Sequence, residues 1–380
     1  MINNIEKYLS LYHNKSFDEV PLNEADLVCG AIISYADFDG NKRFKKYHLE
    51  NSVVPFTTFH TKKDFDLFAA KCIDPASMRN FLKVFFKSKR YRNIRFGFVE
   101  NIYDNKNATQ FFAFAGFAKK YTVIFFRGTD TTIIGWKEDL DIASKDKIPS
   151  QILAKKYLYK IAAISNRPII IVGHSKGGNL GYYAFLSASK EIKNKVVRVY
   201  NFDGPGFNNE KFKPDEYKDK LKKFVPSSSI VGMLLEKTTN YEIVKSSKRN
   251  IDAHDLLTWE FSKESRYTKL VRLKSLSKYS FALKIAILEW YNKYTKKDFK
   301  DIADFMYGIA MSNKQVTILN LKLDVIKQRK VYLHSIQNYN KKKKEKLKIM
   351  SRDFVKSYFY ILFHIKEYDV ETLKLMTNQE

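Results

Sequence analysis

The feature that most constrains the fold of this chain is a short apolar run that ends directly in a glycine-rich turn. The run Pro168-Ile169-Ile170-Ile171-Val172 leads into Gly173-His174-Ser175-Lys176-Gly177 without an intervening polar residue. An uninterrupted apolar run of this length is typical of a strand that is buried on both faces of a parallel sheet. A helical pattern follows over residues 179–190. The segment is therefore predicted to form a strand, a tight turn and a helix.

Strands and helices alternate on both sides of this segment. Asn23 is the expected N-cap of a helix that runs through Tyr35. Further helices are predicted over residues 136–142 and 151–165, and further strands over residues 94–103, 111–118, 122–126, 196–202 and 240–246. Alternation at these lengths indicates an α/β fold with a mostly parallel central sheet.

The C-terminal third of the chain has a different pattern. After about Glu260 the strand signals stop, and the expected helices are basic and cover residues 281–294, 299–311 and 314–335. A dense lysine run follows from Lys341 to Lys348. We therefore predict an α/β domain with a helical N-terminal segment over residues 1–265, and a basic α-helical C-terminal region over residues 266–380.

The pentapeptide at Gly173 to Gly177 matches G-x-S-x-G, the pattern of a nucleophile elbow between a strand and a helix. In such a turn the glycines let neighbouring backbone pass closely, and the serine stands at the positive end of the helix dipole. Ser175 is the predicted nucleophile. A glycine-rich turn without chemistry would show the same five residues.

A serine nucleophile needs a base that removes its proton. In the chain order of α/β-hydrolases the base follows the nucleophile, which leaves His254, His334 and His364. His254 lies in a polar loop just after the last predicted strand of the domain, whereas the other two lie in the basic helical region. His254 is therefore the predicted base.

The acid of a triad is the least constrained residue. Asp203 directly follows the strand predicted over residues 196–202, at the edge where parallel sheets bind ligands. An aspartate before Gly204-Pro205-Gly206 is also a common turn former. Asp203 is the first choice, and Asp252 and Asp255 remain alternatives.

An oxyanion hole needs two donors, and the sequence offers a candidate for each. One is the backbone N–H of Lys176, the residue after the serine. The other is Thr129, which follows a strand in Phe126-Arg127-Gly128-Thr129 and carries both a backbone N–H and a hydroxyl. Arg127 and Asp130 are expected to pair and to hold this loop.

These motifs resemble a known family pattern. The class 3 lipase pattern is similar in three segments, Phe126 to Thr129, Trp136 to Asp139 and Gly173 to Asn179. More closely, the chain resembles a bacterial lipase-like α/β-hydrolase family, the Mbeg-like group catalogued as domain of unknown function 2974. The segments similar to that family are Val20 to Asp26, Ser34-Tyr35, Ser229 to Leu235, and His254-Asp255 before Trp259.

The resemblance covers about residues 1–270 and implies an α/β-hydrolase core with Ser175 and His254 as nucleophile and base. It implies no substrate. Class 3 lipases carry an aspartate near the position of Ser227 to Ser229, so this chain departs from them at the acid.

Composition limits the partners and the location. The chain has 68 Lys and Arg against 41 Asp and Glu, a net charge of +27, which attracts anionic surfaces without dictating a fold. Peripheral contact with an anionic membrane is expected, whereas nucleic acid is not expected as a specific partner because no recognised motif accompanies the charge. Two cysteines and an N-terminus without a signal-peptide core favour the cytoplasm, peripheral to the inner face of the membrane. Neither a cofactor nor a metal is expected.

Together, these residues predict a serine hydrolase that cleaves a carboxylic ester, such as an acylglycerol or a phospholipid, through a Ser-His-Asp acyl-enzyme mechanism. The alternative is a catalytically silent α/β-hydrolase-like binding module. In that alternative the basic helices dock a partner or an anionic membrane.

Overall fold

The computed structural model describes residues 4–38, 44, 46–130, 133–209, 211–264, 267–312 and 341–365. Its centre is a nine-stranded sheet in the order β1-β2-β3-β4-β5-β6-β7-β8-β11, beside a two-stranded sheet of β9 and β10. The strands are β1 Val53–Pro55, β2 Arg95–Asp104, β3 Thr109–Phe117, β4 Thr122–Phe126, β5 Ile169–His174, β6 Val196–Phe202, β7 Leu221–Pro226, β8 Glu242–Val244, β9 Phe261–Glu264, β10 Tyr267–Leu270 and β11 Arg272–Leu273.

The predicted α/β fold with C-terminal helices is confirmed, and its central sheet is mixed, with consecutive parallel strands in one half only. Strands β4 to β8 are parallel to one another, whereas β1 to β4 pair antiparallel and β11 pairs antiparallel with β8. The connections over residues 105–108 and 118–121 are hairpin turns, because four residues cannot make the crossover that parallel neighbours need. The parallel half still brings the carboxyl ends of β4 to β7 to one edge.

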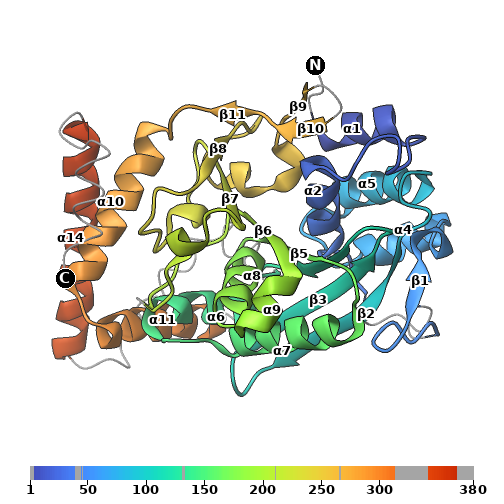
Figure 1. Ribbon diagram of the computed structural model, residues 1–380. Coiled ribbons are helices and arrows are strands. Elements are labelled where there is room, and N and C mark those ends of the chain that lie inside the picture. The colour runs from blue at the N-terminus through green and yellow to red at the C-terminus, as the bar shows by residue number, and fades with distance from the viewer. Residues whose placement is uncertain are drawn as a thin grey trace.

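Helices cover both faces of this sheet (Figure 1). The helices are α1 Ile5–Tyr12, α2 Glu24–Ile33, α4 Lys62–Ala69, α5 Pro75–Lys87, α6 Ile133–Ser144, α7 Pro149–Ile164, α8 Lys176–Leu186, α9 Lys190–Lys195, α10 Lys278–Lys293, α11 Lys296–Ser312 and α14 Lys341–Phe363. Alternate residues of β3 separate the two layers, since Phe112 and Phe114 pack with α2, α4 and α5, whereas Phe111 and Ala113 pack with α7 and α8.

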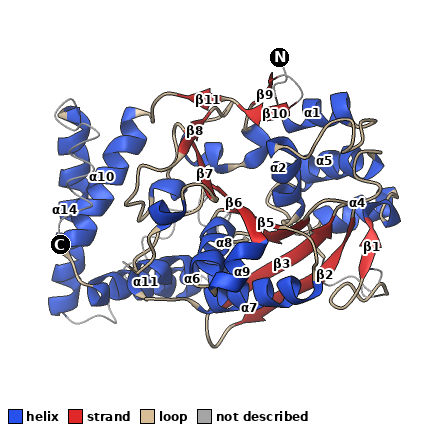
Figure 2. Cartoon of the chain, viewed as in Figure 1, coloured by secondary structure: helices blue, strands red, loops and turns tan. Residues whose placement is uncertain are grey.

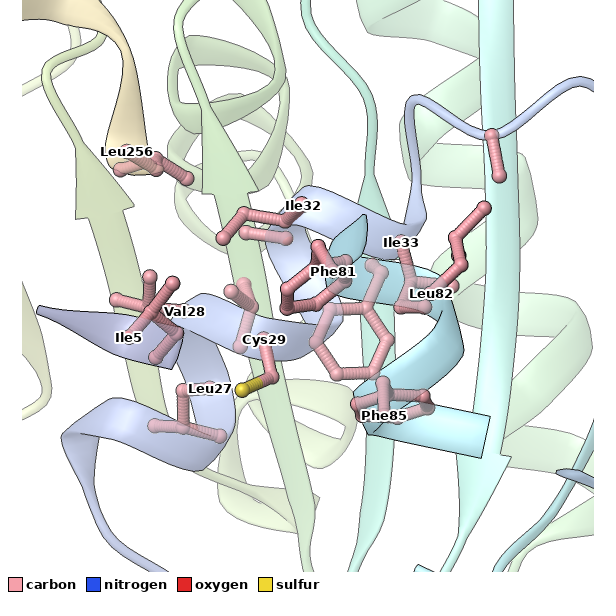
Figure 3. Close-up of a cluster of buried hydrophobic side chains, with 14 of the residues drawn as sticks. Ile5, Leu27, Val28, Cys29, Ile32, Ile33, Phe81, Leu82, Phe85 and Leu256 are labelled. Atoms are coloured by element: carbon pink, nitrogen blue, oxygen red, sulfur yellow. The ribbon is translucent and has the colours of Figure 1, made fainter. Parts of the chain in front are cut away.

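The N-terminal helices form an aromatic core against the sheet. Cys29 and Ile33 of α2 meet Phe81 and Phe85 of α5 in the cluster of Figure 3. The predicted N-cap Asn23 is confirmed, because its side chain accepts a hydrogen bond from the backbone N–H of Ala25. Helix α2 lies against β4 and β5, the two strands whose carboxyl ends lead to the loops of the site.

The expectation that strands end near Glu260 is wrong. Strands β9 and β10 form a hairpin, and β11 pairs with β8 (Figure 2). These strands are short and carry Lys263, Lys269 and Arg272. The guanidinium of Arg272 binds the carboxylates of Glu24 and Glu242. Strands of two to four residues are too short for sequence periodicity to distinguish them from the exposed face of a basic helix. The division at residue 265 remains a prediction.

The C-terminal helices lie at one side of the molecule (Figure 1). Helix α11 packs against α6, and α14 packs against α10 around Ala282, Ile285, Ala286 and Ile361. The helix predicted over residues 314–335 lies outside the described residues. Within the described part of the chain, no helix has both the length and the apolar composition that crossing a membrane requires.

Candidate active site

The turn between β5 and α8 has the geometry predicted from the pentapeptide. Ser175 lies between the last residue of β5 and the first residue of α8, with a positive φ of 58°. A Cβ on Gly173 would lie 2.0 Å from the carbonyl oxygen of Gly177, so no larger side chain fits there. The predicted strand, tight turn and helix are confirmed.

The loop after β4 contacts the nucleophile turn directly. A Cβ on Gly128 would lie 2.7 Å from the Cβ of Ser175. The next residue, Thr129, donates its hydroxyl to Asp139 Oδ2 at 2.6 Å, and burial raises the pKa of Asp139 to about 6. The hydroxyl of Thr129 is therefore directed to α6, which leaves its backbone N–H as the candidate donor to an oxyanion.

The start of the loop after β4 is held by the ion pair that the sequence predicts. Arg127 Nη2 lies 3.7 Å from Asp130 Oδ2, and both groups contact the hydroxyl of Tyr103. The guanidinium also lies 4.5 Å above the ring centroid of Phe112. The predicted pairing of Arg127 and Asp130 is confirmed.

Asp203 and His254 meet at the carboxyl edge of the sheet. His254 Nδ1 lies 2.7 Å from Asp203 Oδ2, and the Asp203 side chain is fully buried. A carboxylate can only accept, so the proton of His254 is on Nδ1 and the lone pair of Nε2 is available to a base function. The two alternatives for the acid lie elsewhere: Asp252 is exposed, and Asp255 accepts a hydrogen bond from the backbone N–H of Leu257.

Ser229 completes the surroundings of Asp203, a role that no sequence motif predicted. Its hydroxyl donates to Asp203 Oδ1 at 2.5 Å and accepts from the backbone N–H of Gly232 at 3.1 Å. Both oxygens of the buried carboxylate therefore have a partner. One sequence feature did point to this position: Ser229 lies near where class 3 lipases carry an aspartate, and the chain departs from their pattern there.

His174 and Tyr35 connect the three loops of the site, and they were also missed. His174 Nε2 lies 2.8 Å from the carbonyl oxygen of His254, and the hydroxyl of Tyr35 lies 2.7 Å from His174 Nδ1. Because a carbonyl only accepts, His174 carries its proton on Nε2 and receives the hydroxyl proton of Tyr35 on Nδ1. Burial, together with the nearby charge of His254, holds the pKa of His174 well below its usual range. A neutral His174 therefore ties α2 and the nucleophile turn to the loop of His254.

The ring of His254 lies close to the turn, with its centroid 4.4 Å from that of His174. Among the residues that the structure describes, no hydrogen bond joins the hydroxyl of Ser175 to the His254 ring. Such bonds are often long in unliganded active sites and shorten when the substrate binds.

Lys176 has two separate features. As the first residue of α8, its backbone N–H faces no carbonyl of the helix. Its side chain is buried, and Nζ donates to Glu138 Oε2 at 2.8 Å and to Gln110 Oε1 at 2.9 Å. This ion pair anchors α6 and β3 to the helix that carries the nucleophile.

Among the residues that the structure describes, no group of three or more His, Cys, Asp or Glu side chains could hold a metal ion. The expectation of no metal and no cofactor remains a prediction.

A comparison with known protein families identifies the family of this chain. The family described as Mbeg1-like matches residues 85–308, which is 224 of the 380 residues and includes Ser175, Asp203 and His254. The chain belongs to the Mbeg1-like family. This result confirms the family predicted from the motifs, and the Mbeg1-like range continues beyond the sheet into α10 and α11.

One solved structure is similar to this Mbeg1-like chain. A crystal structure of a mutant of MDLA from Penicillium cyclopium has 14% sequence identity and a TM-score of 0.37, and the match covers 66% of this chain and 87% of that chain. A search of the curated proteins found no match.

Proposed function

We propose that this protein is a serine hydrolase that cleaves a carboxylic ester. The observation that carries the proposal is the contact of 2.7 Å between His254 and the buried Asp203, in a loop that His174 ties to the turn of Ser175. A buried carboxylate on Nδ1 orients the imidazole and stabilises its protonated form.

The chemistry follows from these positions. Ser175 Oγ attacks the acyl carbon while its proton moves to His254 Nε2, and Asp203 stabilises the imidazolium. The backbone N–H groups of Lys176 and Thr129 stabilise the oxyanion of the tetrahedral intermediate. The C–O bond to the leaving alcohol then breaks, and His254 returns the proton to that alkoxide. Water enters, His254 removes its proton, and hydrolysis releases the acid and restores Ser175.

The substrate class that we propose is an acylglycerol or a phospholipid. Support comes from the resemblance of the motifs around Thr129 and Ser175 to the class 3 lipase pattern. The proposal keeps the location expected from the sequence, in the cytoplasm and peripheral to the inner face of the membrane.

Hydrolysis of a chain-length series of p-nitrophenyl esters tests this function. We expect the full-length protein to turn over at least one member of the series, and Ser175→Ala to lower kcat by about 10³-fold or more while circular dichroism is unchanged. Equal rates for the two proteins would contradict Ser175 as nucleophile. No hydrolysis by either protein would favour the silent binding module.

Ser229→Ala is expected to lower kcat by about ten- to a hundredfold with little change in KM, because a hydrogen bond to a charged acceptor typically contributes about 1.5–3 kcal/mol. The loss would leave one oxygen of the Asp203 carboxylate without its donor. Steady-state kinetics on the best ester of the series would measure it. Ser187→Ala is the matched control, since that hydroxyl donates to the carbonyl oxygen of Tyr183 at the end of α8. Equal kinetics for both variants would show that Ser229 does not position the acid.

A further inference from the structure

Helix α14 carries aromatic residues both on the face that packs against the protein and on the face that is exposed. One face packs on α10 through Ile361 and the partly buried Phe354 and Tyr358. This packing is fixed by polar contacts along its length: Trp290 Nε1 donates to the carbonyl oxygen of Met350, and Asp353 accepts from Lys293 and Tyr294. The orientation of α14 about its own axis is therefore defined.

The opposite face carries an exposed apolar row. Val355, Phe359 and Phe363 follow one another at four-residue spacing, so they lie on one side of the helix. Their exposed fractions are 50%, 49% and 78%, and Tyr360 beside them is 54% exposed. The rings of Phe359 and Phe363 stack on each other, with centroids 6.4 Å apart. Large apolar side chains gathered in this way mark an interaction site more often than single exposed ones do.

A basic row lies directly beside the apolar row. Lys348, Arg352 and Lys356 repeat at the same four-residue spacing, and all three are exposed. Across Lys341–Phe363 there are eight Lys or Arg and two acidic residues, so the helix carries a net charge of +6. In Figure 1, α14 is the outermost helix on its side of the molecule, with α10 between it and the sheet.

We propose that this face of α14 docks the protein on an anionic lipid bilayer. The charge complementarity commits the proposal to that occupant, because the basic row matches anionic head groups while the adjacent phenyl rings reach the acyl boundary. Tyr360 suits the head-group level, where amphipathic aromatic rings gather. A nucleic acid would engage the basic row alone and would leave Val355 and Phe363 exposed. The proposal goes beyond the proposed hydrolysis and does not rest on it.

Vesicle sedimentation tests the proposal with the full chain. The vesicles are made of ether-linked phosphatidylcholine alone or with about one third ether-linked phosphatidylglycerol, so that no carboxylic ester is available for hydrolysis and the binding result is independent of activity. We expect binding to the anionic vesicles only. The double variant Phe359→Ser with Phe363→Ser is expected to lower the partition coefficient at least about tenfold, because two phenyl rings no longer enter the bilayer.

The matched control removes two apolar side chains from other surfaces. Leu11→Ser with Ile73→Ser changes residues that are 56% and 60% exposed, and it is expected to bind as the wild type does. Replacing Lys348, Arg352 and Lys356 by Gln is expected to remove the preference for anionic vesicles. Unchanged thermal melts show that the variants are folded. Wild-type binding by the Phe359 and Phe363 variant would overturn the proposal, and so would equal binding to neutral and anionic vesicles, or loss of binding in the Leu11 and Ile73 control.

Discussion

Asp203→Asn is expected to lower kcat for ester hydrolysis by about 10⁴-fold while the fold is unchanged. The amide would accept from Ser229 through its oxygen and present its NH₂ group to His254 Nδ1. That contact requires an unprotonated Nδ1, so the proton of His254 would move to Nε2, which could then no longer accept the proton of Ser175. Asparagine also tolerates the positive φ of 52° at this position, so the backbone is not strained by the change.

The control for this variant is Asp252→Asn, which changes an exposed aspartate in the segment of His254. It is expected to retain kcat within about twofold, as surface substitutions away from a site usually do. Steady-state kinetics with circular dichroism of each variant would measure both. Equal losses in the two variants, or full activity in Asp203→Asn, would contradict the assignment of the acid.

Asp26→Asn is expected to lower the free energy of unfolding by about 3–5 kcal/mol, because it breaks a buried ion pair and leaves the cation without its partner. Asp26 accepts from Arg90 Nε at 2.7 Å and Nη2 at 2.6 Å, and from the hydroxyls of Tyr8 and Tyr91, each at 2.8 Å. Both charged side chains are about 1% exposed. The same guanidinium also donates to backbone carbonyls of the loop after α1, so the loss would loosen how α1 and α2 join.

The matched control for Asp26 is Asp18→Asn, since Asp18 pairs with Lys119 at 3.3 Å on the surface, with both side chains mostly exposed. It is expected to cost less than about 1 kcal/mol. Urea titrations of the three proteins would give the free energies. A loss for Asp26→Asn as small as that for Asp18→Asn would contradict a structural role for the buried pair.

The elements that the sequence predicted well have strong local signals. The strand expected over residues 196–202 matches β6 Val196–Phe202, because β-branched and aromatic residues dominate the segment and a turn follows at once. The turn of Ser175 also has a local signal, since a Cβ on Gly173 would meet Gly177 within the same turn. In contrast, the antiparallel direction of β2 and β3 depends on a four-residue connection rather than on the strands themselves.

The residues that were missed act over long separations in the sequence. Tyr35 and His174 are 139 residues apart, and Ser229 and Asp203 are 26 apart, so no local pattern connects them. Each is a polar side chain whose partner is determined only when helix α2 or the loop after β7 packs on the sheet. The choice of Asp203 over Asp252 and Asp255 as the neighbour of His254 likewise depended on which loop ends meet at the sheet edge.

The central claim is that Ser175 is an activated nucleophile, and covalent labelling tests it most directly. The purified full-length protein would be treated with a fluorophosphonate probe, and the adduct would be located by mass spectrometry. We expect one adduct, on Ser175, in the wild type, and no adduct at that position in Ser175→Ala or His254→Ala. A folded wild-type protein that gains no adduct on Ser175, or a His254→Ala variant that is labelled as fast as the wild type, would contradict the account.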